Sequence, residues 1–120
     1  MFKEFEKRAQ IDNLPSKFIA ERYKDLVLHQ LRTKKYEDAL ATANKAFENY
    51  SNQLFLKQVL ANTYLLNGQF KKAEKIHRAN KNVKILCESW KSITLKDFET
   101  FRNAGINNEN MKKIENILKD

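Results

Sequence analysis

The feature that most constrains this chain is a short pattern that occurs twice. The first copy reads Tyr36-Glu37-Asp38-Ala39, and the second copy reads Phe70-Lys71-Lys72-Ala73. Leu26 and Leu60 are separated by the same interval as the two aromatic residues. An aromatic residue followed three positions later by a small one, repeated with a period of about 34 residues, predicts a pair of packed helices that occurs twice.

The composition favours an all-helical chain that forms one domain. Apolar residues make up 42% of the sequence, and only two glycines and one proline are present. Because glycine and proline break helices, we expect Pro15, Gly68 and Gly105 at the boundaries between elements. A chain of 120 residues can bury one hydrophobic core but not two.

Apolar residues at spacings of three and four predict the positions of the helices. Five are expected before residue 82: a short one over 2–9, one from Lys17 to the turn at Lys34-Lys35, and further ones over 36–50, 54–66 and 70–79. Ser16 is a candidate N-cap, and Asn67-Gly68 is expected to end the fourth of these helices. From Val83 to Ile93 the apolar residues predict no definite local structure.

The C-terminal part of the chain predicts two more helices. Thr94-Leu95-Lys96-Asp97 resembles a capping box, which places the start of a helix there. That helix would continue through Phe98 and Phe101 and close at Gly105. Asn107 or Asn108 is expected to cap a final helix, whose apolar face holds Met111, Ile114, Ile117 and Leu118.

The second copy of the pattern resembles the tetratricopeptide repeat (TPR) family. It keeps the family's leucine, small residue, tyrosine, turn glycine, aromatic residue and alanine at Leu60, Ala61, Tyr64, Gly68, Phe70 and Ala73. It departs from the family at Lys57, where a tryptophan is usual, and at His77, where an aromatic residue is usual. The closing proline is also missing.

The first copy is similar to the same family at fewer positions. It keeps an aromatic residue, the leucine, the second aromatic residue and the alanines at Tyr23, Leu26, Tyr36, Ala39, Ala43 and Ala46. Gln30 stands where the family has tyrosine, and Lys34 stands where it has the turn glycine. The constant interval between corresponding positions links the two copies.

The resemblance covers residues 20–87 and implies a right-handed array of antiparallel helix hairpins, which is a TPR-like α-solenoid. It divides the single domain 1–120 into an N-terminal arm (1–19), a first repeat (20–53), a second repeat (54–87) and C-terminal capping helices (88–120). No third copy follows, because Arg102 falls at the turn-glycine position and Asn107 at the alanine position. Such repeats bury their faces against neighbours, so we expect residues 88–120 to cap the second repeat. Self-association is the alternative.

In this family the first helix of each repeat lines a concave groove that binds partners. The resemblance places eight residues of this chain there: Lys24, Leu28, Leu31, Arg32, Gln58, Asn62, Leu65 and Leu66. The leucines would supply apolar contact, the two cations would pair with a partner's carboxylate, and the two amides would bond to its backbone. The alternative is that the C-terminal helices fill this groove.

No residue pattern in the sequence favours catalysis, a metal site or a cofactor. The two histidines, His29 and His77, are far apart in the sequence, and each is expected to be a surface or partly buried helix residue. Cys87 has no histidine or cysteine at metal-ligand spacing, and we expect it to be a small buried residue. Two glycines leave no phosphate-binding loop. Trp90 is expected in the core. Because none of these residues forms a recognisable catalytic or ligand-binding pattern, the sequence predicts a non-catalytic protein without a cofactor.

The net charge of +8 indicates an acidic partner, a nucleic acid or an anionic surface, or it serves only solubility. Lysine outnumbers arginine by 18 to 5, which disfavours specific nucleic-acid recognition because that relies on the arginine fork. No apolar stretch approaches the roughly 20 residues that a membrane span needs, and the N-terminal residues lack the apolar run of a signal peptide. A single cysteine fits a reducing compartment. We therefore expect a cytoplasmic location.

These observations predict a small adaptor or a chaperone-like accessory protein. It would bind a protein or peptide segment, preferably an acidic one, on the concave face of its repeats. Two alternatives stay open. One is a homo-oligomeric scaffold, such as a homodimer, and the other is a basic protein that associates with nucleic acid.

Overall fold

The computed structural model describes residues 16–85 and 87–119 of the chain. Its helices are α2 (Ser16–Arg32), α3 (Tyr36–Asn49), α4 (Leu54–Leu66), α5 (Phe70–Asn80), α6 (Trp90–Asn103) and α7 (Glu109–Lys119). Two short strands, β1 (Lys84–Ile85) and β2 (Glu88–Ser89), separate α5 from α6. The prediction of an all-helical fold is confirmed apart from this hairpin. The helix predicted over residues 2–9, and most of the predicted arm at 1–19, lie outside the described residues.

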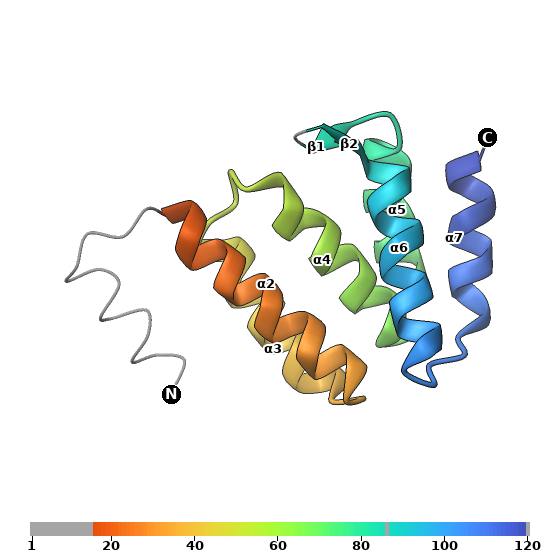
Figure 1. Ribbon diagram of the computed structural model, residues 1–120, viewed down its shortest axis with the longest axis horizontal. Coiled ribbons are helices and arrows are strands. Elements are labelled where there is room, and N and C mark those ends of the chain that lie inside the picture. Colours follow the sequence, from red (N-terminus) through yellow and green to blue (C-terminus); the bar gives the residue numbers. More distant parts are fainter. Residues whose placement is uncertain (1–15, 86, 120) are drawn as a thin grey trace.

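The helices follow one another in pairs along the long axis of the molecule (Figure 1). In the pairs α2–α3 and α4–α5 the two helices pack along each other, and α4 also packs against both helices of the first pair. The helix α7 packs against α5 and α6 at the far end. Within the described part of the chain, no helix combines the length and the apolar character needed to cross a lipid bilayer.

Small residues line the contact within the helix pairs. Ala39, Ala43 and Ala46 on α3 and Ala73 on α5 are all at most 2% exposed. Alanine has a short side chain, so a facing helix can approach closely at these positions. These alanines include the small residue of the repeated pattern in each copy, Ala39 and Ala73, which is therefore buried in both.

The turn inside each helix pair, between α2 and α3 and between α4 and α5, adopts the same backbone conformation. Lys34 and Gly68 occupy equivalent positions in the two copies and have φ angles of 63° and 79°. This left-handed region suits glycine, because a Cβ atom is strained there. Asn67-Gly68 ends α4 as predicted, whereas Lys34 adopts the same conformation with a full side chain.

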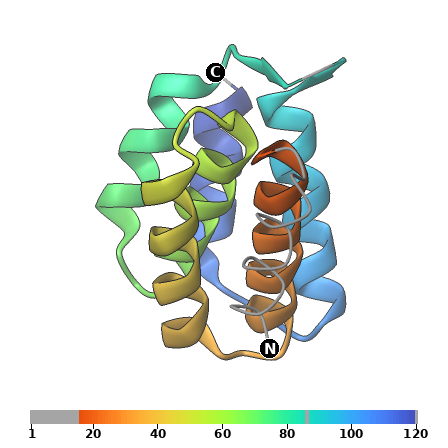
Figure 2. The same ribbon diagram turned by 90° about the vertical axis from the view of Figure 1, so that its left-hand side faces the viewer.

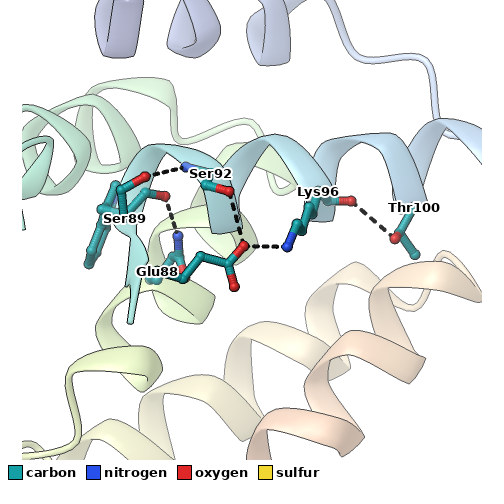
Figure 3. Close-up of polar contacts among 7 residues, drawn as sticks. Glu88, Ser89, Ser92, Lys96 and Thr100 are labelled. Atoms are coloured by element: carbon teal, nitrogen blue, oxygen red, sulfur yellow. Dashed lines mark hydrogen bonds and ion pairs between the residues drawn. The ribbon is translucent and has the colours of Figure 1, made fainter. Parts of the chain in front are cut away.

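The start of α6 differs from the prediction. The helix begins at Trp90, and the hydroxyl oxygen of Ser89 caps it by accepting a hydrogen bond from the Ser92 amide at 3.0 Å (Figure 3). The capping box predicted at Thr94 and Asp97 is therefore wrong, since both residues lie inside the helix. Ser89 has an extended backbone, with φ −74° and ψ 151°, which is the usual geometry of an N-cap. The extended chain before it forms the β1–β2 hairpin, in which Lys84 pairs with Ser89.

The two C-terminal helices share one hydrophobic core with the helix pairs. Trp90, Phe98, Phe101, Met111 and Ile114 are at most 1% exposed and pack in the same cluster as residues of α2, α3, α4 and α5. The prediction that Trp90 lies in the core is confirmed. The Asn108 side chain accepts a hydrogen bond from the Asn110 amide at 2.9 Å just before α7, so Asn108 is the predicted cap residue that the structure uses.

Candidate functional site

A groove of about 880 Å³ opens between α2, α4, α6 and the β1–β2 hairpin. We call it the groove, and its lining residues are Lys17, Glu21, Lys24, Leu28, Gln53, Leu54, Phe55, Gln58, Val59, Lys84, Ile85, Cys87, Glu88, Ile93 and Asp97. Figure 2 looks along the molecule from its N-terminal side and shows α6 (blue) beside α2 (orange). The groove is thus formed jointly by the helix pairs and the C-terminal part of the chain.

One face of α2 forms the first wall of the groove. Lys17, Glu21, Lys24 and Leu28 follow each other at spacings of four, three and four, which places them on a single stripe of the helix. The Nζ atom of Lys24 lies 5.5 Å from the ring centre of Phe55 on α4, within cation–π distance. The contact holds the Lys24 side chain across the gap between the two helices.

Gln58 connects α4 to the start of α6. Its side chain is buried, and Nε2 donates hydrogen bonds to the Trp90 carbonyl oxygen at 3.0 Å and to Thr94 Oγ1 at 2.6 Å. Both protons of that amide nitrogen are therefore used inside the protein. Gln58 positions α6 against α4 and leaves no N–H for a partner's backbone.

Asp97 faces the groove from α6 and is half-buried. Its Oδ2 atom accepts a hydrogen bond from Asn62 Nδ2 at 3.4 Å, a long contact. Burial raises the pKa of the Asp97 carboxyl to about 6, while the charge of Lys24 lowers it and that of Glu88 raises it further. Asp97 is thus a carboxylate whose charge is poorly compensated by its surroundings.

A chain of buried hydrogen bonds leads from Asp97 into the core. Asn62 Oδ1 lies 3.0 Å from His77 Nε2, and Trp90 Nε1 donates to His77 Nδ1 at 2.9 Å. Because an indole N–H can only donate, His77 Nδ1 must be an acceptor. His77 is therefore neutral with its proton on Nε2, and Asn62 turns its amide N–H group towards Asp97.

This network contradicts the expectation that His77 is a surface or partly buried residue. Its side chain is completely buried, and burial lowers its pKa from 6.5 to about 4. The ring of Trp90 contacts it edge-on, with centroids 5.8 Å apart. Protonation would place a second proton on Nδ1 and break the bond from Trp90, so the fold favours the neutral form.

At the rim of the groove, Glu88 is bound by α6. Its Oε2 atom accepts a hydrogen bond from Ser92 Oγ at 3.0 Å and forms an ion pair with Lys96 (Figure 3). The hydrogen bond from Lys96 is the main reason that the pKa of Glu88 is lowered. The charges of Glu88 and Lys96 therefore compensate each other within the protein.

The structure divides the eight predicted groove residues into groups. Lys24, Leu28 and Gln58 line the groove. Asn62 is completely buried behind it, where it bonds to Asp97 and His77. The other four are placed elsewhere: Leu31, Leu65 and Leu66 are buried in the core, and Arg32 is exposed outside the groove lining. The helix α6 packs beside α2 and α4, so the predicted groove is covered at one end and open at the other.

Sequence reasoning missed the lining residues that follow α5. Ile93 and Asp97 lie four residues apart on α6, and this spacing could have placed them on one face. It was obscured because Asp97 also fitted a capping box. Cys87, expected to be buried, is exposed and lines the groove, because it lies in the turn of the β1–β2 hairpin.

Comparison of the chain with protein-family models, with curated proteins and with solved structures gave no match in any of the three. Among the residues that the structure describes, no group of three or more histidine, cysteine, aspartate or glutamate side chains could hold a metal ion. The function of the groove is therefore argued from the geometry and charge of its lining residues.

Proposed function

We propose that this chain is a non-catalytic protein-interaction module, such as a small adaptor or a chaperone-like accessory protein. In this proposal the helix pairs form a right-handed TPR-like array, capped by α6 and α7. The equivalent turns at Lys34 and Gly68 and the repeated buried alanines support that arrangement. The single cysteine is compatible with a cytoplasmic location.

The observation that carries the proposal is the groove. Its volume of about 880 Å³ lies in the range of binding pockets, which is roughly 300–1,000 Å³. Three lysines and three acidic residues line the groove together with the apolar residues Leu28, Leu54, Phe55, Val59, Ile85 and Ile93. Apolar area combined with a few polar groups is what a docked segment of another protein needs for affinity and for register.

The experiment that tests this proposal compares two glutamate substitutions on α2. Leu28→Glu places a charge in the groove, whereas Leu26→Glu makes the same change at a half-buried position outside the groove lining. The full-length protein and both variants are used for affinity capture from lysate, and circular dichroism checks that each is folded. We expect a set of captured proteins that Leu26→Glu retains and Leu28→Glu loses.

Two results would contradict the proposed function. One is equal capture by Leu28→Glu and by the parent, which would separate binding from the groove. The other is capture that both substitutions abolish to the same extent while both remain folded, which would point to the whole of α2 as a contact surface.

A further inference from the structure

One carboxylate in the groove has no ion-pair partner within residues 16–85 and 87–119. Asp97 lies on α6 one turn after Ile93, and both side chains line the groove. No lysine or arginine that the structure describes forms an ion pair with Asp97. Its one hydrogen-bond donor among the described side chains, Asn62, is 3.4 Å away. A half-buried carboxylate with so little compensation is unfavourable, and an added positive charge would stabilise it.

Among the described residues, no lysine around the groove forms an ion pair with Asp97. Lys24, whose charge acts on Asp97, lies over the ring of Phe55. Lys96 is paired with Glu88. Lys17 and Lys84 are exposed at the rim. The described residues therefore do not supply a cation that forms an ion pair with the Asp97 carboxylate.

Apolar side chains share the groove with Asp97. Leu28 on α2, Val59 on α4 and Ile93 on α6 are part of the same lining. Lysine and arginine carry an apolar stem of three or four methylene groups, which packs on apolar surface while the head group bonds to a charge. The combination of three aliphatic residues and one carboxylate matches such a side chain.

The net charge of +8 does not by itself predict the partner of this site. Three lysines and three acidic residues line the groove, so the excess positive charge of the chain lies outside it. The lysines are placed on α2 and β1, whereas Asp97 is placed on α6. An acidic side chain that entered beside Asp97 would meet a carboxylate.

We propose that the groove recognises a segment of a partner protein through a lysine or arginine of that segment. The stem of this anchor residue contacts Leu28, Val59 and Ile93, and its cationic head pairs with Asp97. The assignment rests on the proposed function, because it names the chemistry of the segment that docks in the same groove.

The probe for this proposal is a library of short random peptides displayed on phage. It is selected in parallel against the full-length protein, against Asp97→Asn and against Glu21→Gln, a matched control that removes a groove carboxylate on α2. We expect the parent and Glu21→Gln to enrich peptides with a lysine or arginine flanked by apolar residues. Asp97→Asn should lose that enrichment.

A selected peptide then gives the size of the effect by fluorescence anisotropy. Asp97→Asn should weaken its binding about tenfold, and so should replacing the peptide's anchor lysine by norleucine, which keeps the stem and removes the charge. The two changes together should weaken binding no more than either alone, because they remove the same pair. The norleucine peptide tests the pair on the unaltered protein if Asp97→Asn folds poorly.

The outcomes separate this inference from the proposed function. Selection of acidic peptides, or of apolar peptides that bind Asp97→Asn equally well, would overturn the cationic anchor and leave the groove as a docking site. If no selected peptide is lost when Leu28 is replaced by glutamate, the proposed function itself fails.

Discussion

The helix pairs α2–α5 and the C-terminal segment β1–α7 are held together in different ways. Within the pairs, contact is made by small apolar residues such as Ala39, Ala43 and Ala73 at regular spacing. Between the pairs and α6, a buried polar network that contains Gln58, His77 and Trp90 is added to the shared apolar core. Periodic apolar packing determines where helices form, whereas the polar network fixes where α6 lies and so shapes the groove.

The largest effect on stability is expected when a buried alanine within a helix pair is replaced. Ala73→Glu places an unpaired charge at a completely buried position on α5, which should lower the free energy of unfolding by about 3–5 kcal/mol. Ala79→Glu, on the same helix at an exposed position, is the matched control and should change it by less than about 0.5 kcal/mol. Urea denaturation measures both, and similar values for the two variants would count against the packing of α5.

A smaller loss of stability is expected when the buried polar network is altered. Trp90→Phe removes the indole donor and leaves His77 Nδ1 buried without a hydrogen bond, which should cost about 1–3 kcal/mol. In a His77→Leu background the same substitution should cost less, because the acceptor is already gone. Equal costs in the two backgrounds, measured by urea denaturation, would show that the bond contributes nothing.

The pH dependence of stability sharpens the comparison, because two members of the network titrate in opposite directions. Burial lowers the pKa of His77 from 6.5 to about 4, so its contribution to stability is lost as the pH falls through this range. Burial raises the pKa of Asp97 from 3.8 to about 6, so its contribution is lost as the pH rises through that range. Between about pH 4 and 6 the two slopes oppose each other.

Asp97→Asn removes the opposing titration, so the variant should show the dependence of stability on pH that is due to His77. The stability of the variant, relative to the parent, should fall by about 1.4 kcal/mol for each pH unit as the pH is lowered from 6 towards 4. Urea denaturation at several pH values measures this difference. Parallel curves for the parent and the variant would mean that Asp97 does not bind a proton in the folded state over this range.

The smallest effect concerns the two equivalent turns. Lys34→Gly should stabilise the protein by about 0.5 kcal/mol, because glycine adopts the φ of 63° without strain but loses more chain entropy on folding. Gly68→Lys should destabilise it by about 1 kcal/mol, although no atom lies within 4 Å of the added Cβ. Thermal melting of the reciprocal pair tests this, and shifts of the same sign would contradict equivalent turn geometry.

The sequence predicted the regular part of the molecule well. The apolar spacing located α3, α4 and α5 to within one residue at almost every end, because packing there repeats with the helical period. Local preferences alone predicted Gly68 at a helix end and Asn107 or Asn108 as a cap, of which the structure uses Asn108. These features depend on residues that are close together in the sequence.

The placement of α6 could not be predicted in the same way. Gln58 bonds to Thr94, and Trp90 bonds to His77, so these contacts join residues that no local pattern relates. For the same reason the sequence predicts neither the groove position of Asp97 nor the complete burial of His77. Of the residues that line the groove, Lys24, Leu28 and Gln58 followed from the resemblance, whereas the other lining residues on α2 and α4 and those on the hairpin and α6 needed the structure.

The most direct test of the groove as a docking site uses Cys87, the one cysteine in the sequence, which is exposed and lines the groove. A benzophenone–maleimide attached to Cys87 is photoactivated in lysate, and the control carries the same group on Cys87→Ser/Ser51→Cys, at an exposed turn outside the groove lining. Our account predicts an adduct with a discrete protein that forms from Cys87, is absent from the control, and disappears when Leu28→Glu is added. The same adducts from both positions, unaffected by Leu28→Glu, would contradict it.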